Sequence, residues 1–439
     1  MISSWRRKKS ARHAAKKHDL EKHVSMEMRI PDHFRCPISL DLMKDPVTLS
    51  SGMTYDRDSI EAWFEAGKST CPLTNQVLRN LEPIPNQAIR RMIQDWCVEK
   101  RSYGMERIPT PRIPITSVEV LEILSKVEAG GDQECRELVL KIRSLAKESE
   151  RNKRCFVANG TGRALSSKFE AFSRDSIDKH VLILEEIVST LTVISPLDEE
   201  TKLILGSKSS LHCIIWCLRC GSLSSRSNAV LTLRSIISSD QQKVVDLIEI
   251  EGAVESLVKL VKEPICPTTT KASLLAIYYM VSSSTTNYKD DIIKRFVDTG
   301  LVGILVDTLV GCEKSVCEKA LGVLDGIFNS NEGREKAYDN ALTMPVLVKK
   351  VLRVSDLSTE FSVSIVWKLG KNEKREERGV VFEALELGAF QKLLILLQVG
   401  TSEKTKKNAT HLLKLMSLYR NRVVECIDSL DFKNLKRSF

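Results

Sequence analysis

Apolar residues recur along the long C-terminal part of the chain in a series of similar segments. Within each segment they stand at positions i, i+3, i+4 and i+7, the spacing that puts side chains on one face of an α-helix. Successive segments start 42 to 48 residues apart, and their first apolar residues are Leu165 (a weaker copy), Leu211, Val254, Val302, Met344 and Phe390. A chain with this period must fold by stacking units, because one unit cannot bury its apolar face alone.

Two further features repeat with the same period. Gly252, Gly300 and Gly388 each stand two residues before an apolar segment, where a tight turn into a helix favours glycine. A second apolar helix follows in each unit, and its copies start near Ser227, Thr270, Glu318, Thr359 and Lys407. Units of this length with two or three helices are typical of armadillo and HEAT repeats. We therefore expect a mainly α fold, a right-handed α-solenoid over residues 117–439, rather than an irregular bundle with accidental spacing.

Composition restricts the class of protein. At 439 residues the chain is longer than a single core usually grows, which favours several domains or a domain with a repeat array. No apolar run approaches the roughly 20 residues that span a bilayer, and no secretory signal is recognisable. The 12 cysteines show no paired spacing, which indicates reduced thiols. We expect an intracellular, cytoplasmic protein without a membrane span.

The two ends of the N-terminal region differ from what lies between them. Residues 1–28 are rich in Lys and Arg and predict a basic, disordered tail, which is either simply solvated or acts as a nuclear-import or acidic-surface contact. Residues 104–116 contain closely spaced prolines and predict an extended linker. No nucleic-acid-binding motif is recognisable and aromatic residues make up only 5% of the chain, so a nucleic-acid partner is not expected.

Between tail and linker, residues 29–103 predict a small α+β module. Residues 47–55 predict a hairpin with a glycine turn. Asp56 or Asp58 is expected to cap a short helix, and Asn86 a final helix. A loop that contains an isolated cysteine precedes the hairpin, and another follows the short helix. The module therefore consists of two loops that flank a helix.

Two loops around a short helix are the shape of a RING finger, which holds its loops with two zinc ions. The module offers only four candidate ligands: His33, Cys36, Cys71 and Cys97. Four ligands cannot build two tetrahedral sites, and their spacing matches no common pattern for a single one. We therefore expect no metal and no other cofactor. Polar side chains should brace the loops instead, among them Asp56, Arg57 and Asn86.

The segments IPDHFRCPISLDLMKDPV, SSGMTYDRDSIEAW, CPLTNQVL and IPNQAIRRMIQDWC resemble the U-box, the zinc-free relative of the RING. With the repeats that follow, the chain resembles the plant U-box ubiquitin ligases with armadillo repeats. The resemblance implies a RING-type ubiquitin transferase that forms no covalent intermediate. It would bind a ubiquitin-conjugating enzyme that carries ubiquitin, and hold a substrate protein on its repeats. It also implies a role in plant defence or stress signalling.

The resemblance further implies which residues act. Four match the family's apolar contact surface for the conjugating enzyme: Ile38, Leu40, Trp63 and Pro72. Asn75 and Arg79 are candidates for orienting ubiquitin. Two of these assignments have a structural alternative, since Trp63 lies near the apolar stripe of its helix and a loop leucine such as Leu40 often turns inward. Cys36 stands where the family has a structural residue, so no catalytic nucleophile is expected.

Other functions are compatible with the same sequence. The repeats could form a scaffold whose module serves only for docking or for a homodimer. An armadillo-type transport receptor would need a series of Trp and Asn residues on its third helices, where only Trp216 appears among the identified segments. Finally, some lysines on the repeated helices either solvate exposed faces or form a basic stripe for acidic partners: Lys259, Lys262, Lys349, Lys350 and Lys392.

Overall fold

The structure, a computed structural model of the chain, describes residues 30–101, 105–106, 108, 114–238, 242–282, 289–373, 379–399 and 401–428. The chain divides into two units, Met1–Ile113 (unit 1) and Pro114–Phe439 (unit 2), each of which is considered by itself. The predicted basic tail lies outside the described residues, as does much of the predicted linker.

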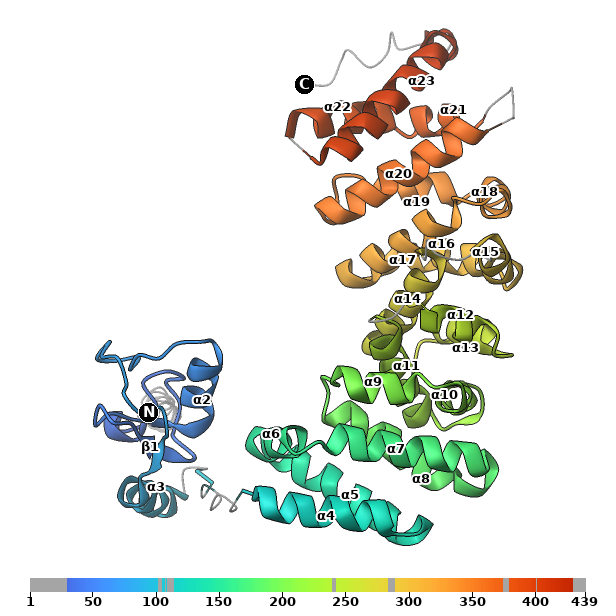
Figure 1. The fold of residues 1–439 in the computed structure, drawn as a ribbon. Helices are drawn as coiled ribbons and strands as arrows, with labels where there is room; N and C mark the ends of the chain where they lie inside the picture. Colours follow the sequence, from blue (N-terminus) through green and yellow to red (C-terminus); the bar gives the residue numbers. More distant parts are fainter. Residues whose placement is uncertain are drawn as a thin grey trace, which may run out of the picture. The chain divides into compact units, whose positions relative to one another are not determined.

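Unit 1 contains a small antiparallel sheet and two α-helices (Figure 1). Its elements are the 3-10 helix η1 (Asp32–Phe34), the strands β1 (Pro46–Thr48), β2 (Thr54–Asp56) and β3 (Ile84–Pro85), and the helices α2 (Arg57–Glu65) and α3 (Gln87–Glu99). The strand order is β2-β1-β3, and Val47 pairs with Tyr55 in the hairpin. The turn between β1 and β2 has Gly52 at a φ of 80°, a left-handed conformation that suits glycine. The predicted hairpin is thus confirmed.

The core of unit 1 lies between the sheet and the two helices. Tyr55 of β2, Ile60 of α2 and Ile93 of α3 are fully buried in it. Helix α3 begins at its predicted cap, because the side chain of Asn86 accepts a hydrogen bond from the backbone N–H of Ile89 at 3.0 Å. A core of this size buries few apolar residues, so the polar contacts described below matter for its stability.

Unit 2 is helical throughout the residues that the structure describes. It begins with α4 (Ser117–Ala129) and α5 (Asp132–Glu148), and six triplets of helices follow. Their first helices are α6 (Glu150–Ala158), α9 (Glu199–Leu205), α12 (Gln242–Ile248), α15 (Lys289–Asp298), α18 (Asn331–Tyr338) and α21 (Val380–Glu386). Their middle helices are α7 (Thr161–Asp175), α10 (Lys208–Cys220), α13 (Ala253–Lys262), α16 (Leu301–Gly311), α19 (Thr343–Lys350) and α22 (Ala389–Val399). Their third and longest helices are α8 (Ile177–Val193), α11 (Leu223–Ile237), α14 (Pro267–Ser282), α17 (Lys314–Ile327), α20 (Asp356–Asn372) and α23 (Glu403–Asp428).

The repeat predicted from the sequence is confirmed. The first set of apolar segments forms the middle helices, and the second set forms the third helices. Gly252, Gly300 and Gly388 have φ values of 82°, 77° and 80° just before their middle helices. Gly160 has a φ of 77° before α7, which extends the pattern to the weaker copy. Glycine therefore sets the entry angle of the middle helix in four of the six triplets.

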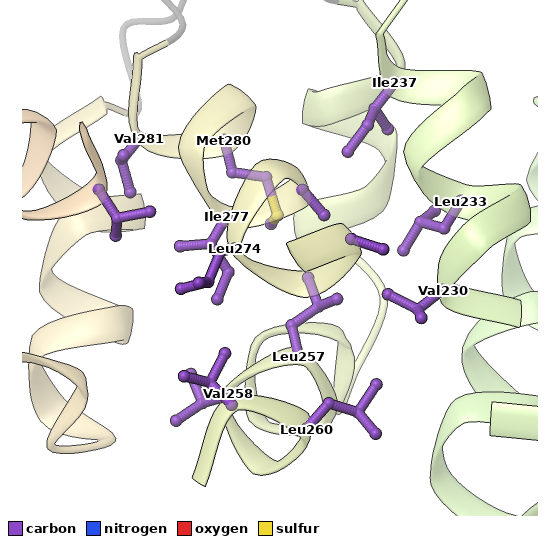
Figure 2. Packing of buried hydrophobic residues seen from close by; sticks show 14 of the residues in the cluster. Val230, Leu233, Ile237, Leu257, Val258, Leu260, Leu274, Ile277, Met280 and Val281 are labelled. Atoms are coloured by element: carbon purple, nitrogen blue, oxygen red, sulfur yellow. The ribbon is translucent and has the colours of Figure 1, made fainter. Parts of the chain in front are cut away.

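The third helices form a continuous row, in which α8, α11, α14, α17, α20 and α23 each pack against the next (Figure 1). Within unit 2, buried residues link all six triplets in one apolar cluster. Figure 2 shows a section of it, which includes Leu233 of α11, Leu257 of α13 and Ile277 of α14. This is the stacking that makes a solenoid stable. None of the described helices is long and apolar enough to cross a membrane.

Two lysines of the proposed basic stripe have structural roles instead. Lys350 is buried, with 8% of its surface exposed. The ammonium group of Lys392 donates hydrogen bonds to the carbonyl oxygens of Val348 and Val351, at 2.6 and 3.2 Å. It thereby satisfies backbone carbonyls at the C-terminal end of α19, where a positive charge also interacts favourably with the helix dipole. Lys350 and Lys392 therefore do not belong to a basic stripe, whereas Lys259, Lys262 and Lys349 are exposed, which is compatible with either interpretation.

Candidate functional site

Two loops of unit 1 have the same pattern of backbone hydrogen bonds. In the first, the N–H of Cys36 donates to the carbonyl of Asp41 at 2.8 Å, and the N–H of Leu40 donates to the carbonyl of Cys36 at 2.9 Å. The N–H groups of Cys71 and Asn75 make the equivalent bonds in the second loop, both at 2.9 Å. Leu40 and Asn75 have left-handed φ values of 62° and 56°. Each loop is thus a tight, internally bonded turn that follows a buried cysteine.

The end of strand β2 anchors the first loop through Asp56. Its backbone N–H donates to Sγ of Cys36 at 3.3 Å. Its carboxylate accepts hydrogen bonds from the N–H groups of Lys44 and Asp45, both at 2.8 Å. Asp56 does occupy the cap position of α2, but its side chain makes no hydrogen bond to that helix. The carboxylate therefore braces the chain after the first loop, and the predicted capping bond is absent.

The neighbouring residue, Tyr55, anchors the second loop. Its buried hydroxyl lies 3.1 Å from Sγ of Cys71 and accepts a hydrogen bond from the N–H of Leu73 at 3.2 Å. Burial alone would raise the pKa of the Cys71 thiol, but hydrogen bonds with Ser51, Thr74 and Tyr55 outweigh it and lower that pKa to about 6. The cysteine sulfur is therefore an acceptor for several protein donors.

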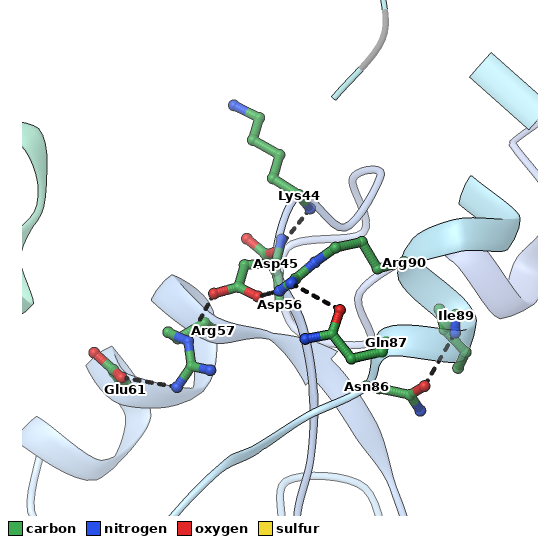
Figure 3. A network of polar contacts seen from close by, with 9 residues as sticks. All are labelled: Lys44, Asp45, Asp56, Arg57, Glu61, Asn86, Gln87, Ile89 and Arg90. Atoms are coloured by element: carbon green, nitrogen blue, oxygen red, sulfur yellow. Dashed lines mark hydrogen bonds and ion pairs between the residues drawn. The ribbon is translucent and has the colours of Figure 1, made fainter. Parts of the chain in front are cut away.

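A poorly exposed ion cluster joins the first loop to both helices (Figure 3). The carboxylate of Asp45 accepts a hydrogen bond from Nε of Arg57 at 2.7 Å, and another from the guanidinium group of Arg90. Arg57 also lies 3.6 Å from Glu61, one turn further along α2. Charge-assisted bonds between poorly exposed groups hold their partners rigidly, and breaking one leaves a charge unpaired.

Asn86 connects the cap of α3 to the sheet. Besides capping α3, its side-chain N–H donates to the hydroxyl of Thr48 at 3.1 Å, and Thr48 contacts Thr54 on β2 at 3.0 Å. All three residues expected to replace zinc, including Asp56 and Arg57, thus take part in polar contacts between elements. Among the residues that the structure describes, no group of three or more His, Cys, Asp or Glu is placed to hold a metal ion.

The four predicted contact residues lie on this braced framework. Leu40 is 64% exposed and does not turn inward. Ile38, Trp63 and Pro72 are half-buried, and Ile38 and Trp63 pack against the core of unit 1. The indole N–H of Trp63 donates to the carbonyl of Thr70 at 2.8 Å, which ties α2 to the second loop. One part of the Trp63 ring therefore packs against the core, and another part is accessible to solvent.

The remaining predicted residues lie beside the second loop. Asn75 and Arg79 are both exposed, and only the backbone of Asn75 has a defined role in the turn. Cys36 and Cys71 are each 0% exposed. A buried thiol cannot reach the thioester of another protein without a rearrangement of the fold, so the geometry offers contact surface rather than a nucleophile.

Three important residues escaped the sequence interpretation. Asp45 and Arg90 form the ion cluster, and Leu73 projects from the second loop with 52% of its surface exposed. Arg90 did carry a signal, because it falls on the buried face of α3 with Ile93, where an arginine requires an acidic partner. Leu73 could have been found from the likeness of CPLT to CPIS, in which it corresponds to Ile38.

Comparison with known proteins gives consistent matches for both units. Residues 30–102 match the family model of the U-box domain, and residues 119–437 match that of the plant U-box protein ARM repeat region. U-box domain-containing protein 21 of Arabidopsis thaliana is 44% identical over 95% of both chains. E3 ubiquitin-protein ligase PUB23 of the same plant is 32% identical over 89% of this chain and 93% of its own. A crystal structure of an engineered protein, 17% identical, has a TM-score of 0.51 over 82% of this chain and 81% of its own, which is a likeness of fold.

Proposed function

Because the chain belongs to the plant U-box proteins with armadillo repeats, and is thus a RING-type U-box ubiquitin ligase whose repeats bind substrate, we propose that its two loops receive a ubiquitin-conjugating enzyme. The enzyme would arrive with ubiquitin attached as a thioester. A lysine of the substrate would then attack that thioester directly. No covalent intermediate forms on the ligase in this scheme, which fits the burial of Cys36 and Cys71.

The proposed contact surface consists of Ile38, Leu40, Trp63 and Pro72. One observation carries the proposal: Leu40 is held at a φ of 62° with most of its side chain in water. Left-handed leucine is strained, by about 1 kcal/mol or more, and such strain is typical of sites that act on a partner. A partly accessible tryptophan such as Trp63 is also among the residue types that dominate binding energy at interfaces.

The ligase would accelerate transfer by position rather than by acid–base chemistry. Binding the loaded enzyme on unit 1 and the substrate on unit 2 makes the reaction intramolecular in effect, which raises the local concentration of the attacking amine. We assign Asn75 and Arg79 the role of contacting ubiquitin, since both are exposed polar side chains beside the second loop. Contacts that are stronger in the reactive arrangement than before it would lower the barrier further.

The test is discharge of ubiquitin from a loaded conjugating enzyme by the full-length protein, across a panel of such enzymes. Ile38→Ala and Trp63→Ala should each slow discharge about tenfold or more, as expected for interface residues worth above 1.4 kcal/mol. Ile84→Ala is the matched control, because Ile84 lies on β3 of the same unit and is 63% exposed. Equal rates for all variants, or no acceleration by the native chain with any enzyme, would contradict the proposal.

Cytoplasmic or nuclear location, a homodimer through unit 1 and a role in defence or stress signalling remain predictions from the sequence. Fluorescent tagging of the full chain, and of the same chain without residues 1–28, would test the location. Light scattering of the full chain would test the homodimer.

A further inference from the structure

The last long helix carries a line of cations. Lys404, Lys407, His411 and Lys414 follow one another on α23 at intervals of three and four residues, which places them along one face. The three lysines are exposed and His411 is half-buried. The buried side of α23 is a different stripe, formed by Thr405, Ala409, Leu412 and Met416. The cations therefore face away from the core of unit 2.

An aromatic group from the preceding long helix lies beside this line. The ring of Trp367 on α20 is 5.0 Å from the ring of His411, at an interplanar angle of 34°. The ammonium group of Lys371, also on α20, lies 5.9 Å from the same indole. Trp367 is half-buried, so part of its ring is open to solvent. We call Trp367, Lys371, Lys407, His411 and Lys414 the α20–α23 surface.

The lysines of this surface differ from their neighbours in their charge partners. Neighbouring lysines are paired, as Lys368 is with Asp325 and Lys406 with Glu403, at 2.7 and 2.8 Å. Within the described ranges, by contrast, Lys371, Lys407 and Lys414 take part in no ion pair of the structure. The described part of this surface therefore carries a net positive charge.

We propose that the α20–α23 surface binds an acidic segment of a partner protein, with an aromatic or aliphatic side chain of that segment resting on Trp367. Opposite charge supplies attraction over a Debye length of about 8 Å at physiological salt, and the indole supplies a contact that excludes water. An anionic membrane is a poorer fit. Among the side chains of α23 that the structure describes, Leu418 is the only large exposed apolar residue on the cationic face, whereas membrane-surface helices need a broad apolar face.

This inference deepens the proposed function, since it specifies the chemistry of a segment that a substrate would present to the repeats. It predicts substrates whose recognised segment is rich in Asp and Glu. Because the charges are exposed, affinity should fall as salt increases. The contact with Trp367 should be less sensitive to salt than the contacts with the lysines.

The experiment is fluorescence anisotropy of the full-length protein with a labelled glutamate-rich peptide that carries one central phenylalanine. We expect Lys407→Glu with Lys414→Glu to weaken binding about tenfold or more, and the milder Lys407→Gln with Lys414→Gln to weaken it less. The matched control is Lys294→Glu with Lys336→Glu, which changes net charge equally at exposed lysines of α15 and α18 and should leave binding within about twofold of native. Trp367→Leu should weaken binding of this peptide but not of one with alanine at its centre.

Equal losses of affinity in the two Lys→Glu double variants would overturn the proposal, since they would show that binding responds to net charge alone. Binding to phosphatidylserine vesicles with no binding to the peptide would overturn it in favour of a membrane. Circular dichroism melting of each variant establishes that the fold is intact. The assay contains no ubiquitin and no conjugating enzyme, so a negative result leaves the proposed ligase mechanism unaffected.

Discussion

Leu40 and Asn75 hold the same left-handed backbone conformation, each four residues after a buried cysteine in its loop. Asparagine adopts this conformation readily, whereas a leucine there is strained. Leu40 keeps the strain although its side chain is 64% exposed and gains little from the core. This combination of strain and exposure is the reason that Leu40 is assigned to the proposed contact surface.

Replacing Leu40 should therefore separate stability from activity. Leu40→Asn removes the strain, so we expect the first loop to become more stable, by about 0.5–1 kcal/mol. The same change should slow ubiquitin discharge, because the apolar side chain is lost. Hydrogen exchange of residues 36–43 measures the first effect, and the discharge assay the second. Faster exchange together with unchanged discharge would mean that Leu40 is a structural residue.

The ion cluster around Asp45 should be essential to the fold of unit 1. Arg90→Ala removes one of the two arginine partners of Asp45 in a poorly exposed place. We therefore expect the free energy of unfolding to fall by about 2–4 kcal/mol. Arg91→Ala is the control, because Arg91 is the next residue on α3 and is exposed. Hydrogen exchange of residues 87–99 in the full chain, at increasing denaturant concentration, measures both. Equal stability of the two variants would show that the cluster contributes little.

The stability of unit 1 should depend on pH through Cys71. The folded pKa of this thiol, about 6, is below its ordinary value of 9.0, so folding favours the thiolate. The stabilisation is fully present above the ordinary value and is lost as the pH falls through about 6. Unfolding free energy should thus rise between pH 6 and 9 in the native chain.

Two variants test the source of that pH dependence. Cys71→Ser should flatten the profile, and Tyr55→Phe should move its midpoint to higher pH because one donor to the sulfur is lost. Cys97→Ser, at another buried cysteine, should keep the native slope. A native profile without slope over this range would contradict the assignment.

Removing metal should not affect the protein. The two loop sulfurs already accept hydrogen bonds, Cys36 from the backbone of Asp56 and Cys71 from Ser51. We therefore expect no stoichiometric zinc by elemental analysis, and the same melting temperature with and without a chelator. A drop in melting temperature on chelation would show that a metal contributes to the fold.

The repeats could be predicted well because their determinants are local. Each helix carries its own apolar period, and a glycine before the middle helix needs only its own turn. The candidate site was harder to predict from the sequence. Exposure of Leu40 and the double role of Trp63 depend on how two loops pack on one strand, which no local pattern contains.

The ion cluster shows the same limit more sharply. Asp45 and Arg90 meet although 45 positions separate them along the chain. Only the place of Arg90 on an apolar helix face pointed to a buried partner, and nothing in the sequence named Asp45. Likewise Lys350 and Lys392 resembled surface cations until the packing of α19 and α22 was known.

The most direct test of the central claim is a crosslink between the loops and a loaded conjugating enzyme. A photoreactive benzophenone amino acid would replace Leu40, Leu73 or, as the control, Ile84 in the full-length protein. We predict crosslinks to the conjugating enzyme from positions 40 and 73 and none from position 84. Crosslinks from position 84 alone, or from none of the three with an enzyme whose ubiquitin the protein discharges, would contradict the claim that these two loops receive the enzyme.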